Sequence, residues 1–195
     1  SMSNIKLVHS GGNSVSLTTP DSNPAANRTV KFPDANGILA LTNGITEFDQ
    51  WYLTASVTSN GDITSNLSRN DKTGAPSQIG TGMSQSSGVF TFPITGKYLV
   101  ICAAEFAIYD ADNVIILTKV TTNNSSYTNV ARALDGNNGS GERSGGDTSF
   151  SFVDVTDTSQ VKVKFEASSI GTNSSITGST GLLTTSFLFI RLGDT

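Results

Sequence analysis

Apolar residues in this chain recur with the period of a β-strand and not with that of an α-helix. No stretch of a dozen residues keeps apolar side chains at positions i, i+3, i+4 and i+7 without an interrupting Gly, Pro or Asn. Short runs instead alternate apolar and polar residues, as Val161, Val163 and Phe165 do with the lysines between them. Such runs, separated by turns rich in Gly, Asn and Ser, predict an all-β chain that folds as an antiparallel β-sandwich of the jelly-roll type.

The pattern changes near residue 45, where we place a domain boundary. Before it, Val15 and Leu17 alternate with polar residues, and the Asn36-Gly37 step is typical of a tight turn. The sequence therefore predicts a short β-rich N-terminal leader, residues 1–45, and a head, residues 46–195. In the head we expect eight longer strands, at residues 49–54, 89–92, 97–109, 114–122, 126–134, 148–155, 160–168 and 183–192.

Two of the expected strands are apolar on both faces. In residues 97–109, Tyr98 and Val100 begin one apolar face and Leu99 and Ile101 begin the other; the last strand repeats this arrangement. A sandwich buries only one face of each sheet against its partner sheet. The second apolar face must be covered by another subunit or by a loop of the same chain. We interpret it as an oligomerisation surface, and the loop remains the alternative.

Composition excludes two classes of partner. The formal net charge is −4 and only 14% of the residues are charged, so the chain lacks the basic face that nucleic-acid binding requires. The longest apolar run, residues 98–108, is interrupted by Glu105 and is too short for a membrane-spanning helix, so we expect no membrane insertion. Residues 1–4 show no charged segment leading into an apolar one, and we expect no signal peptide.

The residues that usually carry catalysis are sparse, and we expect no enzymatic activity. His9 is the only histidine, and the single cysteine, Cys102, lies in the middle of an expected strand; neither has an evident catalytic partner. The four glutamates suggest no carboxylate pair of the glycosidase kind. Glu105 interrupts an apolar face, which favours an ion pair across an interface or a place at the subunit axis. Hydrolysis of a surface polysaccharide remains an alternative.

Two polar turns are candidates for binding a metal ion or a phosphate group. Asp110, Asp112 and Asn113 place three oxygen-bearing side chains in one turn, which suits a hard cation such as calcium. Turns rich in Asp and Asn also form for their backbone geometry alone, so both interpretations stay open. Residues 136–146 are rich in glycine but lack the Gly-Lys-Ser/Thr of a phosphate-binding loop, and they are expected to form a mobile loop.

The leader carries the first resemblance. Residues 11–17, GGNSVSL, and residues 23–41, NPAANRTVKFPDANGILAL, resemble a unit common in bacteriophage tail-fibre and other virion proteins, where it precedes a receptor-binding head. This resemblance covers about thirty residues. It implies a place in the virion, on a tail fibre or on the capsid surface, with other virion proteins as partners.

The head carries the second resemblance. Residues 88–98, GVFTFPITGKY, resemble the G-x-F-x-x-P-x-x-G-x-Y signature of the complement C-one-q and tumour necrosis factor superfamily, and residues 186–192 resemble its closing strand. That superfamily folds as a jelly roll that trimerises, so the resemblance implies a homotrimer. No collagen stalk is present, which favours the viral interpretation. The residues expected in the trimer interface or the core are Phe90, Phe92, Tyr98, Val100, Phe106, Phe187 and Phe189.

Together the two resemblances imply a phage virion or tail-fibre protein whose trimeric head attaches to a receptor on a host surface, either a glycan or a protein. Tyr127 and Arg143 are the candidate contacts for a sugar. The alternative is a purely structural virion component, a capsid decoration or a trimerisation cap. The loops expected to present the binding surface are residues 59–78, 123–127, 134–148 and 169–181.

Overall fold

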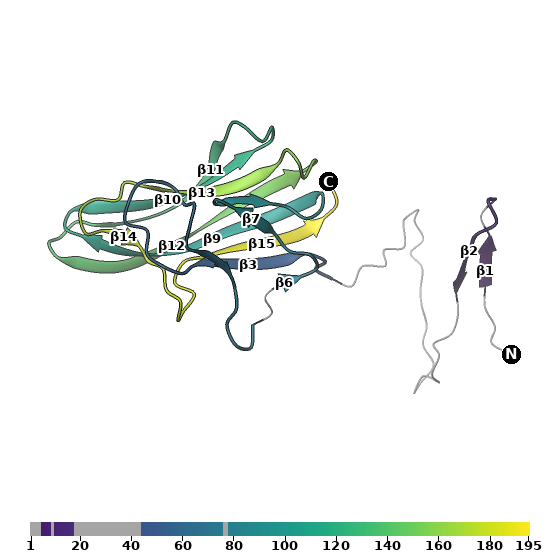
Figure 1. Cartoon of the computed structure of the whole chain (residues 1–195), viewed down its shortest axis with the longest axis horizontal. Helices are drawn as coiled ribbons and strands as arrows, with labels where there is room; N and C mark the ends of the chain where they lie inside the picture. Colours follow the sequence, from purple (N-terminus) through teal and green to yellow (C-terminus); the bar gives the residue numbers. More distant parts are fainter. Residues whose placement is uncertain (1–4, 9, 18–43, 76–77) are drawn as a thin grey trace, which may run out of the picture. The chain divides into compact units, whose positions relative to one another are not determined.

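The computed structural model describes residues 5–8, 10–17, 44–75 and 78–195 (Figure 1). By its internal contacts the chain forms two compact units, Ser1–Ala40 and Leu41–Thr195. In the first unit, β1 (Ile5–Val8) pairs antiparallel with β2 (Ser14–Leu17). The fibre-like motif at residues 23–41, the Asn36-Gly37 step and His9 lie outside the described residues.

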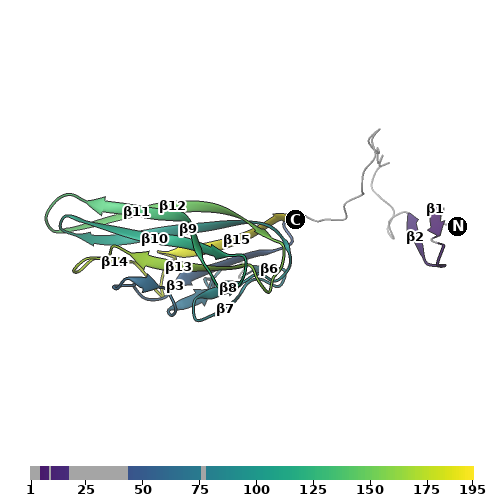
Figure 2. The same cartoon turned by 90° about the horizontal axis from the view of Figure 1, so that it is seen from above.

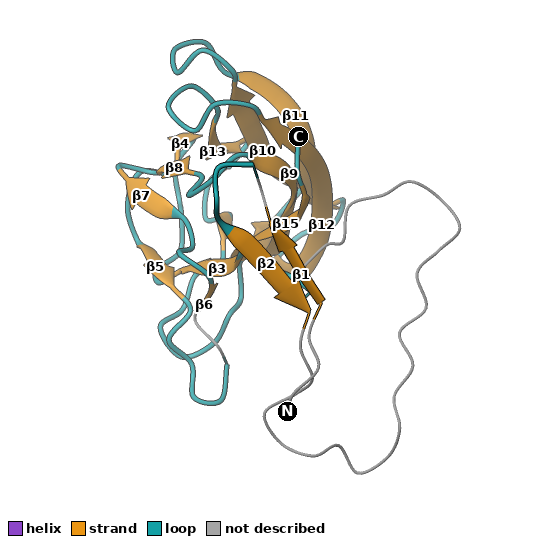
Figure 3. Ribbon diagram, turned by 90° about the vertical axis from the view of Figure 1, so that its right-hand side faces the viewer, coloured by secondary structure: helices purple, strands orange, loops and turns teal. Residues whose placement is uncertain are grey.

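The second unit, which we call the head, is an antiparallel β-sandwich, and its described part contains no helix. One sheet has the strand order β12-β9-β15-β3-β5 and is called the β9 sheet; the other has the order β11-β10-β13-β8-β7 and is called the β13 sheet. The two sheets lie face to face (Figure 3). The strands are β3 (Phe48–Leu53), β4 (Gly61–Asp62), β5 (Leu67–Arg69), β6 (Gln78–Ile79), β7 (Ser84–Ser86), β8 (Val89–Thr91), β9 (Gly96–Tyr109), β10 (Asp112–Thr121), β11 (Thr128–Asn137), β12 (Glu142–Val155), β13 (Lys162–Ser168), β14 (Ser175–Ile176) and β15 (Ser186–Gly193).

The predicted fold class is confirmed, and the eight long strands expected from the sequence correspond to β3, β8 to β13 and β15. The mobile loop predicted for residues 136–146 is wrong, because β11 and β12 continue through it and form a hairpin. Its glycines serve close packing: a Cβ on Gly145 would lie 1.8 Å from the Asp135 carboxylate, and one on Gly146 would lie 2.9 Å from the Ala104 carbonyl oxygen. A glycine-rich stretch therefore stays extended here.

Aromatic rings fill the space between the sheets. Phe90 lies at the centre of this core, with its ring centroid 5.5 Å from that of Trp51 and 5.0 Å from that of Phe189. Phe165 of β13 stacks on Phe187 of β15 at 4.0 Å and so joins the two sheets. All seven residues expected in the core or the interface are at most 1% exposed within one chain, which places them in the core.

The turn between β8 and β9 explains the signature in residues 88–98. Gly96 has φ 147°, and a Cβ there would lie 2.4 Å from the Arg191 Nε atom and 2.6 Å from the Gly193 carbonyl oxygen. Only glycine fits at this position. The turn brings Phe92 within 4.6 Å of the Tyr98 ring, and the Tyr98 hydroxyl donates a hydrogen bond to the Ile94 carbonyl at 3.0 Å. Burial raises the pKa of Tyr98 to about 12, so the hydroxyl remains a donor.

Asp49 of β3 is a buried carboxylate that holds several elements together. It is 1% exposed, and it accepts hydrogen bonds from Arg69 Nε at 3.0 Å, from the Trp51 indole at 2.9 Å and from the Met83 backbone N–H at 2.7 Å. We expect Asp49→Asn to lower the free energy of unfolding by about 2 kcal/mol, because an amide keeps the shape but leaves a buried donor facing other donors. Urea denaturation measures this. Asp154→Asn, an exposed position on β12, is the matched control and should change stability little.

The chain enters the head at the same end at which it finishes. The Arg191 N–H donates to the Glu47 carbonyl at 3.0 Å, and Lys97 pairs with Gly193. We call this the near end, and Figure 2 shows the C-terminus on the side opposite the turn between β11 and β12. The expected presenting loops divide between the two ends: residues 123–127 lie at the near end, where Asn124 N–H donates to the Gln160 carbonyl, and residues 169–181 lie at the far end.

Candidate oligomerisation and binding surfaces

The outer face of the β9 sheet carries two complete rows of side chains across four strands. The row positions follow from the strand register, in which Leu99 and Ile101 of β9 each stand between a β12 phenylalanine and an apolar residue of β15. The first row consists of Phe152, Leu99, Ile190 and Phe48, and the second of Phe150, Ile101, Leu188 and Gln50. We call the seven apolar members of these rows the apolar face.

The apolar face is open to solvent in the single chain. Phe152 is 75% exposed and Phe150 is 62% exposed, while the other members are half-buried. Neither row contains a charged side chain. An uncharged apolar surface of this kind is typical of a protein–protein interface and not of a surface that stays exposed to water. No loop in the described part of the head buries these two rings.

Glu105 lies on the same outer face, two positions along β9 from the half-buried Ala103. It is exposed, and its carboxylate has no ion-pair partner among the residues that the structure describes. The row it belongs to contains Gly146 of β12, so the apolar face becomes polar there. An ion pair of Glu105 across a subunit interface stays a prediction.

The outer face of the β13 sheet carries charges instead. Asp62 of β4 contacts Lys164 Nζ at 2.6 Å and Lys119 Nζ at 3.7 Å, and Lys119 also pairs with Glu166. The hydrogen bond to Glu166 is the main cause that raises the pKa of Lys119. Two ammonium groups and two carboxylates balance, so this cluster has no net charge.

Tyr127 is the predicted sugar contact that lies beside this cluster. Its ring centroid is 4.2 Å from Lys164 Nζ, in a cation–π contact. Burial, and next the negative charge of Asp62, raises the pKa of Tyr127. These contacts could not be predicted from the sequence, because Tyr127, Lys164 and Asp62 come from three distant segments.

Arg143, the other predicted sugar contact, has a structural partner instead. Its Nη1 atom donates to the Asp135 carboxylate at 2.7 Å and to the Gly136 carbonyl at 2.6 Å. Asp135 also accepts the Gly146 N–H at 3.1 Å, and the Leu134 N–H donates to Asp147 at 3.0 Å. Arg143 therefore helps to join β11 and β12, the edge strands of the two sheets, and the structure does not bring it near Tyr127.

The hydrogen bond from Arg143 holds the pKa of Asp135 below its usual value. A carboxylate with a lowered pKa stabilises the fold above its unfolded pKa of about 3.9, and that stabilisation is lost as the pH falls through the lower pKa of the folded state. We expect Asp135→Asn to lower stability by under about 1 kcal/mol at neutral pH, because the pair is partly exposed. Thermal unfolding from pH 7 down to pH 2 should show this difference shrinking only below about pH 4. A difference that grows toward acid would contradict the assignment.

Of the three candidate calcium ligands, Asp110 lies in the turn between β9 and β10, and Asp112 and Asn113 begin β10; the carboxylates of Asp110 and Asp112 contact separate partners. Asp110 accepts the Gly141 N–H at 3.1 Å, and Asp112 accepts the Gly171 N–H at 3.0 Å. Asp110 has φ 51°, and its main-chain N–H donates to the Gly141 carbonyl. These contacts serve the geometry of the far-end loops. Within the described residues no group of three His, Cys, Asp or Glu side chains is placed to hold a metal ion, and calcium binding stays a prediction.

Cys102 lies in the core at 1% exposure, and burial raises the pKa of its thiol, so it remains a protonated apolar side chain. Glu142 accepts a hydrogen bond from the Tyr109 hydroxyl at 2.7 Å. His9, the remaining candidate for catalysis, lies outside the described residues.

None of the described segments forms a helix with the length and apolar character needed to span a membrane.

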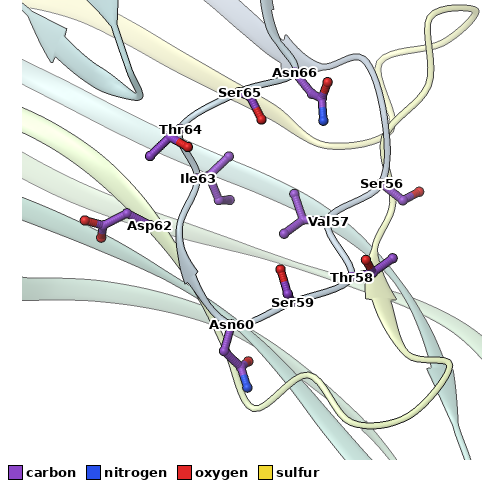
Figure 4. Close-up of a pocket in the computed structure, with 10 residues that line it drawn as sticks. All are labelled: Ser56, Val57, Thr58, Ser59, Asn60, Asp62, Ile63, Thr64, Ser65 and Asn66. Carbon is purple, nitrogen blue, oxygen red and sulfur yellow. The ribbon is translucent and has the colours of Figure 1, made fainter.

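A pocket of about 280 Å³ opens in the loop that joins β3 to β5 (Figure 4). Its lining comes entirely from residues 56–66 and is made mostly of hydroxyl and amide side chains. It overlaps the first of the presenting loops expected from the sequence, residues 59–78. Asp62 lines the pocket and also belongs to the charge cluster beside Tyr127.

The two antiparallel sheets form a jelly roll, and solved structures with a similar fold include tumour necrosis factor-like proteins. Among solved structures it is similar to Eiger TNF from S. frugiperda, with a TM-score of 0.55 and 12% identity over 78% of this chain and 96% of that one. It is also similar to murine APRIL at pH 5.0, with a TM-score of 0.53 and 10% identity over 75% of this chain and 98% of that one. At these identities the similarity concerns the fold. No protein-family model and no curated protein matches the sequence.

Proposed function

We propose that the chain assembles into a homotrimer through the apolar face. The observation that carries this proposal is the pair of uncharged rows with two strongly exposed phenylalanines, Phe150 and Phe152. A second copy of the chain is the natural cover for this face. Every copy carries the same apolar surface, and the copies are present together at equal concentration. The fold supports three copies, since the superfamily that residues 88–98 resemble trimerises.

We further propose that this trimer is the attachment head of a phage virion or tail-fibre protein and that it binds a glycan or protein receptor on a host surface without catalysis. The resemblance of residues 23–41 to fibre leaders supports the virion assignment. The shape of the head supports attachment, because the chain enters at the near end and leaves the far-end loops free for a partner. Three copies would add weak contacts into avidity.

Two measurements on the whole chain test this function. Light scattering after size exclusion should give about 61 kDa, three times the 20.3 kDa chain. A glycan array and binding to intact host-type cells should then show attachment that weakens when the protein is diluted to monomer. A mass of 20.3 kDa would contradict the trimer. A stable trimer that binds neither glycans nor cells would favour the structural alternative, a decoration or cap that clamps a fibre.

A further inference from the structure

The loop between β3 and β5 forms a closed ring of residues 54–66. Its neck is closed by the pairing of Leu53 with Leu67 and by a hydrogen bond from the Thr54 N–H to the Asn66 carbonyl at 2.8 Å. The chain can turn here because Gly61 has φ 127° and Asn66 has φ 58°. The ring surrounds the pocket of about 280 Å³ (Figure 4).

Contacts around the ring fix its shape. Val57 exchanges two backbone hydrogen bonds with Ile176 of β14, at 2.9 and 3.0 Å, and the Ile63 N–H donates to the Phe165 carbonyl at 2.9 Å. Two side chains of the ring, Ser56 and Asn60, accept backbone N–H groups from residues 178 and 170 at 3.2 and 2.8 Å. A pocket held on all sides is preformed, so a ligand would not need to order it.

The interior of the ring is mainly polar, with a small apolar patch at Val57 above the buried Ile63. Figure 4 shows the side chains of Val57 and Ile63 pointing inward, together with the hydroxyls of Ser59 and Ser65 and the amide of Asn66. Within the described part of the chain, these two hydroxyls and this amide have no hydrogen-bond partner. Hydrogen-bonding groups placed around an apolar surface are the pattern of a site that orients a small polar ligand.

The charge of the site selects among such ligands. Asp62 points away from the ring, and its carboxylate is neutralised by Lys164 and Lys119. No charged side chain points into the ring in Figure 4. The volume lies just below the range of about 300–1,000 Å³ that holds drug-sized ligands, which suits a single sugar ring. The hydroxyls of a pyranose complement the hydroxyl and amide groups of the lining, and one of its C–H faces can rest on the small apolar patch at Val57.

We propose that the ring of residues 54–66 is a binding site for one neutral sugar unit of a surface glycan. This inference rests on the attachment role proposed above and names the place where attachment occurs. Tyr127 contacts Lys164, Lys164 pairs with Asp62, and Asp62 belongs to the pocket lining. Tyr127 therefore supports the wall of the pocket and does not itself contact the sugar.

Saturation-transfer-difference NMR on the full chain tests the site, with free N-acetyl-D-glucosamine, D-galactose and D-mannose at millimolar concentrations and with N-acetylneuraminic acid as the charged comparison. Ser65→Ala removes one hydroxyl. Asn66→Gly removes the amide while it keeps a residue that tolerates the positive φ. Ser140→Ala, in the exposed turn between β11 and β12, is the matched control.

We expect a neutral sugar to bind, with an affinity about threefold to tenfold weaker in each pocket variant and unchanged in Ser140→Ala. No binding of any neutral sugar, equal binding in all variants, or tighter binding of the charged sugar would overturn the proposal. Light scattering on the same samples separates this result from the proposed function. A trimer without sugar binding overturns the pocket alone, whereas a monomer that binds sugar overturns the trimer alone, because the pocket lies within one chain.

Discussion

Replacing Phe152 with Asp is expected to convert the chain from the proposed trimer of about 61 kDa into a monomer of 20.3 kDa. Phe152 is 75% exposed in the single chain, so the monomer should fold normally with a carboxylate at that position. In the trimer the same carboxylate would be buried among Leu99 and the other members of the apolar face without a partner. An uncompensated buried charge costs several kcal/mol, which is enough to prevent association at micromolar concentrations.

Light scattering after size exclusion measures the mass, and circular dichroism verifies that the variant is folded. Ile94→Asp is the matched control: it places the same charge at an exposed isoleucine in the turn between β8 and β9, away from the apolar face, and should leave the mass unchanged. If Phe152→Asp remained a trimer, another surface of the head would have to form the interface.

Phe90→Ala is expected to lower the free energy of unfolding by about 3–5 kcal/mol. Phe90 is fully buried and lies within ring-contact distance of Trp51, Phe165, Phe187 and Phe189, so its removal leaves a cavity bordered by both sheets. A loss of this size is a large fraction of the stability of an ordinary domain. Urea denaturation in the Phe152→Asp background would measure the change for a single chain, free of any contribution from association.

Leu182→Ala is the control for this measurement. Leu182 is 71% exposed in a far-end loop, and truncating it should change stability by no more than about 0.5 kcal/mol. A loss in Phe90→Ala no larger than the loss in Leu182→Ala would show that the rings around Phe90 do not form the core.

The long strands could be predicted from the sequence because a period of two persists over seven or more residues, as in Val161, Val163 and Phe165. Two-residue strands such as β4, β6 and β14 carry no such pattern, and they exist only because β13, β3 and β9 pair with them. The N-terminal half of β12 could not be predicted as a strand for another reason. Its glycines resemble a loop, whereas in the structure Asp135 of β11 packs against them.

The two apolar faces of β9 show what the sequence pattern alone cannot predict. The sequence indicates that both faces need cover, but it does not say which face meets the partner sheet. The inner face of β9, with Tyr98, Val100 and Phe106, is buried in one core cluster with Phe90 of β8 and Phe165 of β13 in the other sheet. Phe150 and Phe152 could have been singled out from the alternation of Ser and Phe in residues 149–152, yet the same alternation fits a strand with its phenylalanines inside.

The binding pocket had only a weak signal in the sequence, namely a polar loop rich in Ser, Thr and Asn. Its shape depends on contacts between residues distant along the chain, such as Val57 with Ile176 and Ile63 with Phe165. Whether the hydroxyl of Ser65 faces the interior or the solvent depends on these contacts. Residue type could suggest a loop that presents polar groups, but not that the loop closes into a ring around a pocket.

The position of the C-terminus beside the point where the chain enters the head has a practical consequence for protein engineering. A fluorescent protein or an affinity peptide fused after Thr195 would lie at the near end and leave the loops at the far end unobstructed. The turn at residues 138–141, at the opposite end, is the complementary position for an inserted peptide, because it is exposed and joins two long paired strands. One head could therefore display a foreign epitope at one end while a surface or a reporter is coupled to the other.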